Sequence, residues 1–338
     1  MSSLQDAVSE EAERTGFAGV VRVDRAGEIE LCAAYGLADR AHRIPHTVDT
    51  RLATASGAKG LTALAAMALV ERGTLELGTT ARSLLGDDLP LVGDDVTVEH
   101  LLAHRSGIGD YLDEDEVDSV TDYVMPVPVH RLATPEQYLA VMGGHATVSP
   151  AGERFAYNNG GYVLLALLAE RASGESYHGL VRALVCEPAG MVDTAFLRSD
   201  ELPGRAALGY LVADGLRTNV LHLPVRGVGD GGAYATAADL SAFWESLFAG
   251  RIVSPALVSE MVRPHSDWPE EDKRYGLGFH LAPTGDAVWL EGYDAGVSFA
   301  SLHRPSAALT YTVLSNWSDG AWPLVSLLNQ RLDTRTPQ

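Results

Sequence analysis

The chain has 338 residues, enough for one large composite domain or two smaller ones. Hydrophobic residues make up 46% and charged residues 21%, as in ordinary globular proteins, so disordered, collagen-like and coiled-coil classes are excluded. Because 25 basic residues stand against 45 acidic ones, for a net charge of −20, binding to nucleic acid or to an anionic membrane surface is disfavoured.

The two cysteines, Cys32 and Cys186, are far apart and form neither a disulfide framework nor a zinc-binding spacing. The first residues lack the basic segment and apolar run of a secretory signal. The longest apolar runs, such as residues 162–169, are too short to span a bilayer. We therefore expect a cytoplasmic protein with no membrane segment.

The first expected elements are an acidic amphipathic helix over residues 3–15 and a hairpin of strands over 19–24 and 28–37. An Ala- and Leu-rich stretch over 58–72 ends at a glycine and predicts a long buried helix. Cap residues then predict further helices at 98–103, from 135, at 237–249 and from 255. An apolar run predicts another helix at 162–171.

The pattern changes after residue 275 to short β-type runs, at 276–281, 287–290, 297–303 and 309–314, and a last helix is expected at 322–331. Strands at both chain ends predict an α+β fold, in which an antiparallel sheet from both ends is flanked by helices and interrupted by a mostly helical region. We assign 1–56 and 275–338 to the sheet part and 57–274 to the helical part, with the active site at their junction. We interpret the acidic run 113–118 as a solvated surface loop.

The first chemical signal is a serine and a lysine three positions apart, Ser56 and Lys59, at the start of the helix expected from residue 58. This spacing places both side chains on one face of the helix. A serine hydroxyl becomes a nucleophile when a base takes its proton, and a desolvated lysine can be that base. The helix N-terminus adds backbone amides that can stabilise an oxyanion.

The second signal is the segment 155–161, which contains Tyr157 and Asn159 just before another apolar helix. A tyrosine beside an ammonium group can act as a base, or as the acid that protonates a leaving group. Taken alone, Tyr157 also fits a packed loop aromatic.

These motifs, in this order, resemble those of the serine β-lactamase and penicillin-binding-protein superfamily, in its branch of class C β-lactamases, DD-peptidases and esterases. Further family-like segments lie at 100–107, 229–240, 275–279 and 314–316. The resemblance implies that Ser56 is the acylated nucleophile, Lys59 its base or proton relay, and Tyr157 the partner that completes proton transfer. Asn159 would orient Lys59 and the substrate carbonyl.

The family's third motif, Lys or His followed by Thr-Gly, is altered in this chain. We align Tyr293-Asp294-Ala295 with it, which implies a second oxyanion amide at Gly296. Neither Tyr293 nor Asp294 can donate a charge-assisted hydrogen bond to a substrate carboxylate. An aromatic residue at this position also resembles some esterases of the family.

The sequence therefore predicts a serine hydrolase that acts on small ester or amide substrates through an acyl-Ser56 intermediate. Three alternatives remain: β-lactamase, DD-peptidase or D-aminopeptidase activity, acyl transfer at the same site, and a non-catalytic binding protein with this fold. No cofactor is implied, and the oligomeric state is not predicted. His100 and His104 have a helical spacing that could share a metal, but a third ligand is not evident, so we expect no metal site.

Overall fold

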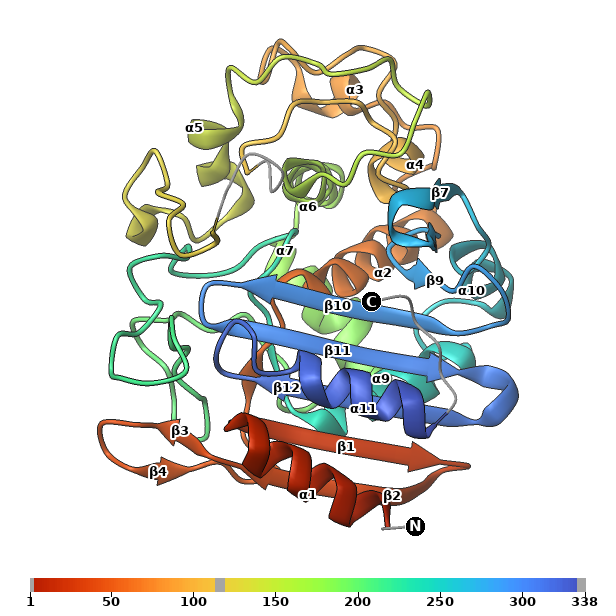
Figure 1. Ribbon diagram of the computed structural model, residues 1–338. Helices are drawn as coiled ribbons and strands as arrows, with labels where there is room; N and C mark the ends of the chain where they lie inside the picture. Colours follow the sequence, from red (N-terminus) through yellow and green to blue (C-terminus); the bar gives the residue numbers. More distant parts are fainter. Residues whose placement is uncertain (1–2, 113–118, 333–338) are drawn as a thin grey trace.

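The computed structural model describes residues 3–112 and 119–332. Its main feature is an antiparallel eight-stranded sheet in the order β2-β1-β12-β11-β10-β9-β8-β7, in which strands from the two ends of the chain pair side by side (Figure 1). The strands are β1 (Gly19–Arg25), β2 (Glu28–Tyr35), β7 (Ser266–Trp268), β8 (Lys273–Tyr275), β9 (His280–Leu281), β10 (Val288–Asp294), β11 (Val297–Arg304) and β12 (Leu309–Ser315). This arrangement confirms the predicted α+β fold.

Two terminal helices, α1 (Leu4–Thr15) and α11 (Trp322–Arg331), cover one face of the sheet (Figure 1). Their apolar side chains pack on the outward-facing residues of the strands, in a core that includes Val8, Trp289 and Leu328. The remaining helices lie outside this layer, some on the other face of the sheet and some packed on one another. These are α2 (Ala58–Glu71), α3 (Ala81–Leu85), α4 (Val98–Leu102), α5 (Leu139–Met142), α6 (Asn159–Ser173), α7 (Tyr177–Val181), α8 (Glu187–Ala189), α9 (Ala237–Phe248) and α10 (Pro255–Met261).

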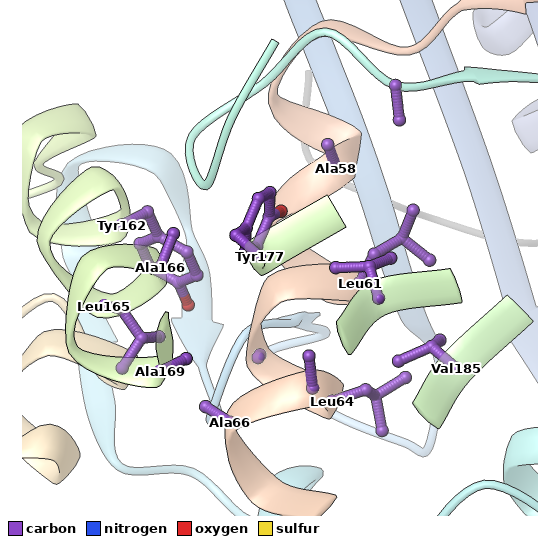
Figure 2. Close-up of a cluster of buried hydrophobic side chains, with 14 of the residues drawn as sticks. Ala58, Leu61, Leu64, Ala66, Tyr162, Leu165, Ala166, Ala169, Tyr177 and Val185 are labelled. Atoms are coloured by element: carbon purple, nitrogen blue, oxygen red, sulfur yellow. The ribbon is translucent and has the colours of Figure 1, made fainter. Parts of the chain in front are cut away.

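Helix α2 lies at the centre of the larger core. Nearly all of its residues are buried, since the sheet, α6 and α7 surround it. Figure 2 shows side chains of α2 such as Leu61 and Leu64 together with those of α6, among them Tyr162 and Leu165. Because a helix packed on every side cannot shift without opening cavities, α2 is a rigid support for any side chain at its start.

Four short strands complete the fold: β3 (Leu37–Asp39) pairs with β4 (Ile44–Pro45), and β5 (Leu52–Ala53) pairs with β6 (Tyr234–Ala235). The strand predicted at 276–281 is wrong in its first part, because 276–279 form a turn in which Gly278 has φ +93°. Strand β7 and the first two residues of β8 come before residue 275, inside the region assigned to helices. The division at residues 56 and 275 stays a prediction.

The acidic run 113–118 lies outside the described residues. Within residues 3–112 and 119–332, we find no helix with both the length and the apolar composition to cross a membrane.

Candidate active site

Ser56 lies in a short 3-10 turn, η1 (Ala55–Gly57), that leads directly into α2. A hydrogen bond anchors the residue before this turn, since the Thr54 N–H donates to the carbonyl of Ala233 over 2.8 Å. A glycine follows Ser56 because there is no room for a side chain: a Cβ at Gly57 would lie 2.2 Å from the ring of Phe299 on β11. The ring of Phe299 therefore limits how closely Ser56 and the rest of η1 approach the sheet.

Lys59, on the first turn of α2, is 2% exposed and has three hydrogen-bond partners. Its Nζ lies 2.9 Å from Ser56 Oγ, 2.8 Å from Asn159 Oδ1 and 2.8 Å from the carbonyl of Asp230. An ammonium group has three donors, so all three are directed at these acceptors. A neutral amine would donate to Asn159 and Asp230 and turn its lone pair to Ser56.

Asn159 is the first residue of α6, and its side chain is oriented by two contacts. Its Oδ1 accepts from Lys59, while its Nδ2 donates to the carbonyl of Leu112 over 3.2 Å. The backbone is held by Asp110, whose carboxylate accepts from the N–H groups of Asn159 (2.6 Å) and Gly160 (2.8 Å). Burial raises the pKa of Asp110 to about 6, although these hydrogen bonds favour its charged form.

Tyr157 places its ring beside Lys59, with the Nζ 4.9 Å from the ring centroid. The ring lies between two others: His104 at 4.4 Å and Trp268 at 6.0 Å between centroids. The structure thus brings Ser56, Lys59, Tyr157 and Asn159 together, and the roles expected for them stay predictions.

Asp230 and Tyr111 were missed by the sequence analysis. The Tyr111 hydroxyl donates to Asp230 Oδ2, and both residues line a cavity beside Ser56. Burial raises the pKa of Asp230, and the charge of Lys59 opposes that shift. The family-like segment 229–240 contains Asp230, but the sequence offers no signal that this residue contacts a tyrosine more than a hundred positions away.

The third motif requires a correction. A Cβ at Gly292 would lie 2.1 Å from the carbonyl oxygen of Thr54 and 3.0 Å from the backbone nitrogen of Ser56, so this strand position accepts only glycine. The motif's glycine therefore corresponds to Gly292, and the motif position of Lys or His is occupied by Leu290. The alignment of Tyr293-Asp294-Ala295 with the motif is three positions too far along the chain.

The expected oxyanion amide at Gly296 is also wrong. Gly296 belongs to the turn between β10 and β11, and its N–H donates to Ser318 Oγ over 2.9 Å. Ala295 is fully buried in the same turn, where its carbonyl accepts from Asn219. Tyr293 and Asp294, in contrast, line the cavity beside Ser56.

The cavity has a volume of about 300 Å³, which suits a small organic substrate. Apolar side chains such as Leu112, Met125 and Leu223 form part of its wall, and Ser56 and Asn159 lie in it. We find no group of three potential metal-ligating side chains within the described ranges. His104, one of the two histidines considered for a metal, instead accepts a hydrogen bond from the Asn158 N–H at its Nδ1.

Comparison with known proteins identifies the family. The beta-lactamase family profile matches residues 4–334, and the chain therefore belongs to this family of serine hydrolases. The crystal structure of a penicillin-binding protein from Bacillus halodurans superposes with a TM-score of 0.90 at 34% identity, over 96% of this chain and 99% of that one.

Two curated relatives carry different names. Esterase EstB from Burkholderia gladioli is 34% identical over 233 residues, which cover 62% of this chain and 55% of EstB. The putative penicillin-binding protein PbpX from Bacillus subtilis is 26% identical over 280 residues, which cover 82% of this chain and 65% of PbpX. The chain thus matches less than two thirds of the length of either relative.

Proposed function

We propose that this chain hydrolyses small esters or amides through a covalent acyl-Ser56 intermediate. The observation that carries the proposal is the contact of 2.9 Å between Lys59 Nζ and Ser56 Oγ. The other two partners of Lys59 are fixed acceptors, so an unprotonated amine there directs its lone pair to the serine hydroxyl. This is the geometry that a general base needs.

In the first step, Ser56 Oγ attacks the substrate carbonyl carbon while its proton passes to Lys59 Nζ. The carbonyl oxygen becomes an oxyanion. When the tetrahedral intermediate collapses, the bond to the leaving group breaks, and the proton returns through Lys59 or Tyr157 to the leaving oxygen or nitrogen. A water molecule then attacks the acyl-enzyme in the same way and regenerates Ser56.

Backbone amides of Ser56 and Tyr293 would stabilise the oxyanion. Asp294 pairs with Val297 across the two-residue turn between β10 and β11, so its N–H faces β11. Successive residues of a strand point their N–H groups to opposite edges, and Tyr293 therefore faces the other edge. Strand β9 pairs there only with Val288 and Trp289, and further along this edge Gly292 packs against η1.

The replacement of the motif's basic residue by Leu290 favours substrates without a carboxylate. Leu290 is 3% exposed and packs on α2, so this strand position offers no donor to an anion. The similarity to EstB supports an esterase, whereas the similarity to PbpX supports the alternative of penicillin binding. Cytoplasmic localisation and acyl transfer in place of hydrolysis stay predictions.

Hydrolysis of p-nitrophenyl acetate and butyrate by the native protein and by Ser56→Ala tests the proposal. We expect turnover that the variant loses, together with little or no labelling of Ser56 by a fluorescent penicillin. Equal rates in the two proteins would contradict an acyl-Ser56 mechanism, and efficient penicillin labelling would favour the penicillin-binding alternative.

A further inference from the structure

The cavity beside Ser56 has an acidic and aromatic wall. Among the described residues that line it, Asp230 and Asp294 are the carboxylates, and neither a lysine nor an arginine is present. The aromatic side chains in the wall are those of Tyr111, Tyr123, Tyr138, Tyr234 and Tyr293. Carboxylates and tyrosine rings are the groups that bind organic cations in proteins.

Lys59 balances part of this acidity, because its charge favours the ionised form of Asp230, but it offers no donor to a substrate anion. Its Nζ is directed at Ser56 Oγ, Asn159 Oδ1 and the carbonyl of Asp230, and only 2% of the residue is exposed. With three donors directed at three acceptors, its ammonium form has none left for a substrate anion. A carboxylate-bearing ligand would therefore enter a cavity with two like charges and without a cationic donor.

The two carboxylates act on one shared part of the cavity. Asp230 and Asp294 line the same cavity as Tyr138, and their charges add to the effect of burial, which raises the pKa of Tyr138 well above its usual range. Tyr111 donates its hydroxyl to Asp230 and meets Tyr138 edge to face, with 5.9 Å between ring centroids. Two acids and two aromatic rings thus surround the same space.

Each carboxylate accepts at least one hydrogen bond that orients it. Asp230 accepts from Tyr111, and Asp294 Oδ1 accepts from the Ala295 N–H over 2.8 Å. The cavity holds preoriented negative charge that a bound cation would neutralise.

We propose that the substrate carries an ammonium group, which Asp230 and Asp294 bind against the rings of Tyr111 and Tyr138. This inference rests on the acyl-Ser56 chemistry proposed above and narrows its substrates to esters or amides of amino or quaternary ammonium compounds. The net charge of −20 supports it, because a strongly negative protein attracts cationic ligands.

Two pairs of isosteric substrates test the proposal on either side of the scissile bond. Acetylthiocholine and 3,3-dimethylbutyl thioacetate differ only by the positive charge in the leaving group. Alanine p-nitroanilide and isobutyryl p-nitroanilide differ by an ammonium in place of a methyl in the acyl group. We expect the cationic member of at least one pair to have a kcat/KM about tenfold higher.

The variants Asp230→Asn and Asp294→Asn should each reduce this ratio, since the amide keeps the acceptor for Tyr111 or Ala295 but loses the charge. Asp94→Asn is the matched control, because its side chain is 90% exposed and does not line the cavity. The ratio within each variant is the readout, so that a general loss of activity does not affect the comparison.

Binding to Ser56→Ala, measured by calorimetry, separates this proposal from the proposed function. Tighter binding of the cationic members, lost in Asp230→Asn, would support the ammonium site even if the native protein turned over none of the esters. Equal affinity for the charged and neutral members of both pairs would overturn it, even if Ser56-dependent hydrolysis of p-nitrophenyl acetate were intact.

Discussion

The imidazole of His104 lies 4.4 Å from the ring of Tyr157, tilted by 32°, and His104 also binds the backbone on either side of that tyrosine. The Ala156 N–H donates to the His104 carbonyl over 2.8 Å, and the Asn158 N–H donates to His104 Nδ1 over 3.1 Å. His104 is 1% exposed and has φ +54°, a conformation that costs energy for most residues. These contacts make it a positioning residue for Tyr157.

Two substitutions separate the acceptor of His104 from its ring. His104→Asn keeps an acceptor near the place of Nδ1 and a residue that tolerates positive φ, whereas His104→Phe keeps a ring but leaves the Asn158 N–H unpaired. We expect His104→Phe to lose about 1–3 kcal/mol of stability and His104→Asn to lose less. Both should lower kcat more than they change KM, because the role proposed for Tyr157 is proton transfer. Kinetic constants of both variants identical to those of the native protein would contradict this role.

Lys59→Met replaces the proposed base with an uncharged side chain of similar length. We expect the acylation rate to fall by at least ~100-fold, since Ser56 loses its proton acceptor. The melting temperature should change much less than the rate, because methionine fills the same buried space. Stopped-flow measurement of the p-nitrophenol burst gives the acylation rate, and a near-normal burst would remove Lys59 from the proton path.

Gly292→Ala tests the corrected position of the third motif. The added methyl group would overlap the Thr54 carbonyl and press on the backbone nitrogen of Ser56, so η1 must shift. We expect a strong loss of ester hydrolysis, together with a lower melting temperature. Gly78→Ala is the control, because nothing lies within 4 Å of a Cβ at that position. Native kinetics for Gly292→Ala would show that β10 does not approach Ser56 as described.

Buried histidines make the stability of the fold depend on pH. Burial lowers the pKa of His178 to about 4, and the same cause lowers those of His46, His280 and His303 to about 4. The ordinary value in an unfolded chain is about 6.5. Between these values the unfolded chain binds protons that the folded chain does not. The stability is therefore complete above about pH 6.5 and is lost as the pH falls towards 4.

His178→Gln isolates one of these groups. The Nε2 of His178 lies 2.8 Å from the carbonyl of Gly227, and a glutamine amide can donate there without titrating. At pH 5 we expect the variant to recover on the order of 1 kcal/mol of unfolding free energy relative to the native protein, with little difference at pH 7.5. Urea unfolding at both pH values measures this, and a pH-independent difference would count against the account.

The sequence predicted those parts of the fold whose signals are local. The hairpin at the N-terminus and α2 follow from alternation and from a long apolar stretch that ends at Gly73. The pairing of Lys59 with Ser56 follows from helical spacing alone. Asp110 and Asp230 were not predicted as parts of the site, because their roles depend on contacts with α6 and Tyr111 that no local pattern encodes.

The third motif shows a different limit. The sequence alignment places Ala295 at the motif's glycine, but the requirement for glycine arises from the approach of Thr54 and Ser56 to Gly292. That approach exists only once β10 lies beside η1. The packing of β10 against η1 also shows that Leu290, and not a basic residue, occupies the first position of the motif.

The most direct test of the account is to trap the acyl-enzyme. The native protein and Ser56→Ala are mixed with p-nitrophenyl acetate, quenched in acid within the burst phase, digested and analysed by mass spectrometry. We expect one acetyl group on the peptide that contains Ser56 in the native protein, and no acetyl group on the corresponding peptide of the variant. An acetyl group on another residue, or burst kinetics that persist in Ser56→Ala, would contradict the assignment of Ser56 as the nucleophile.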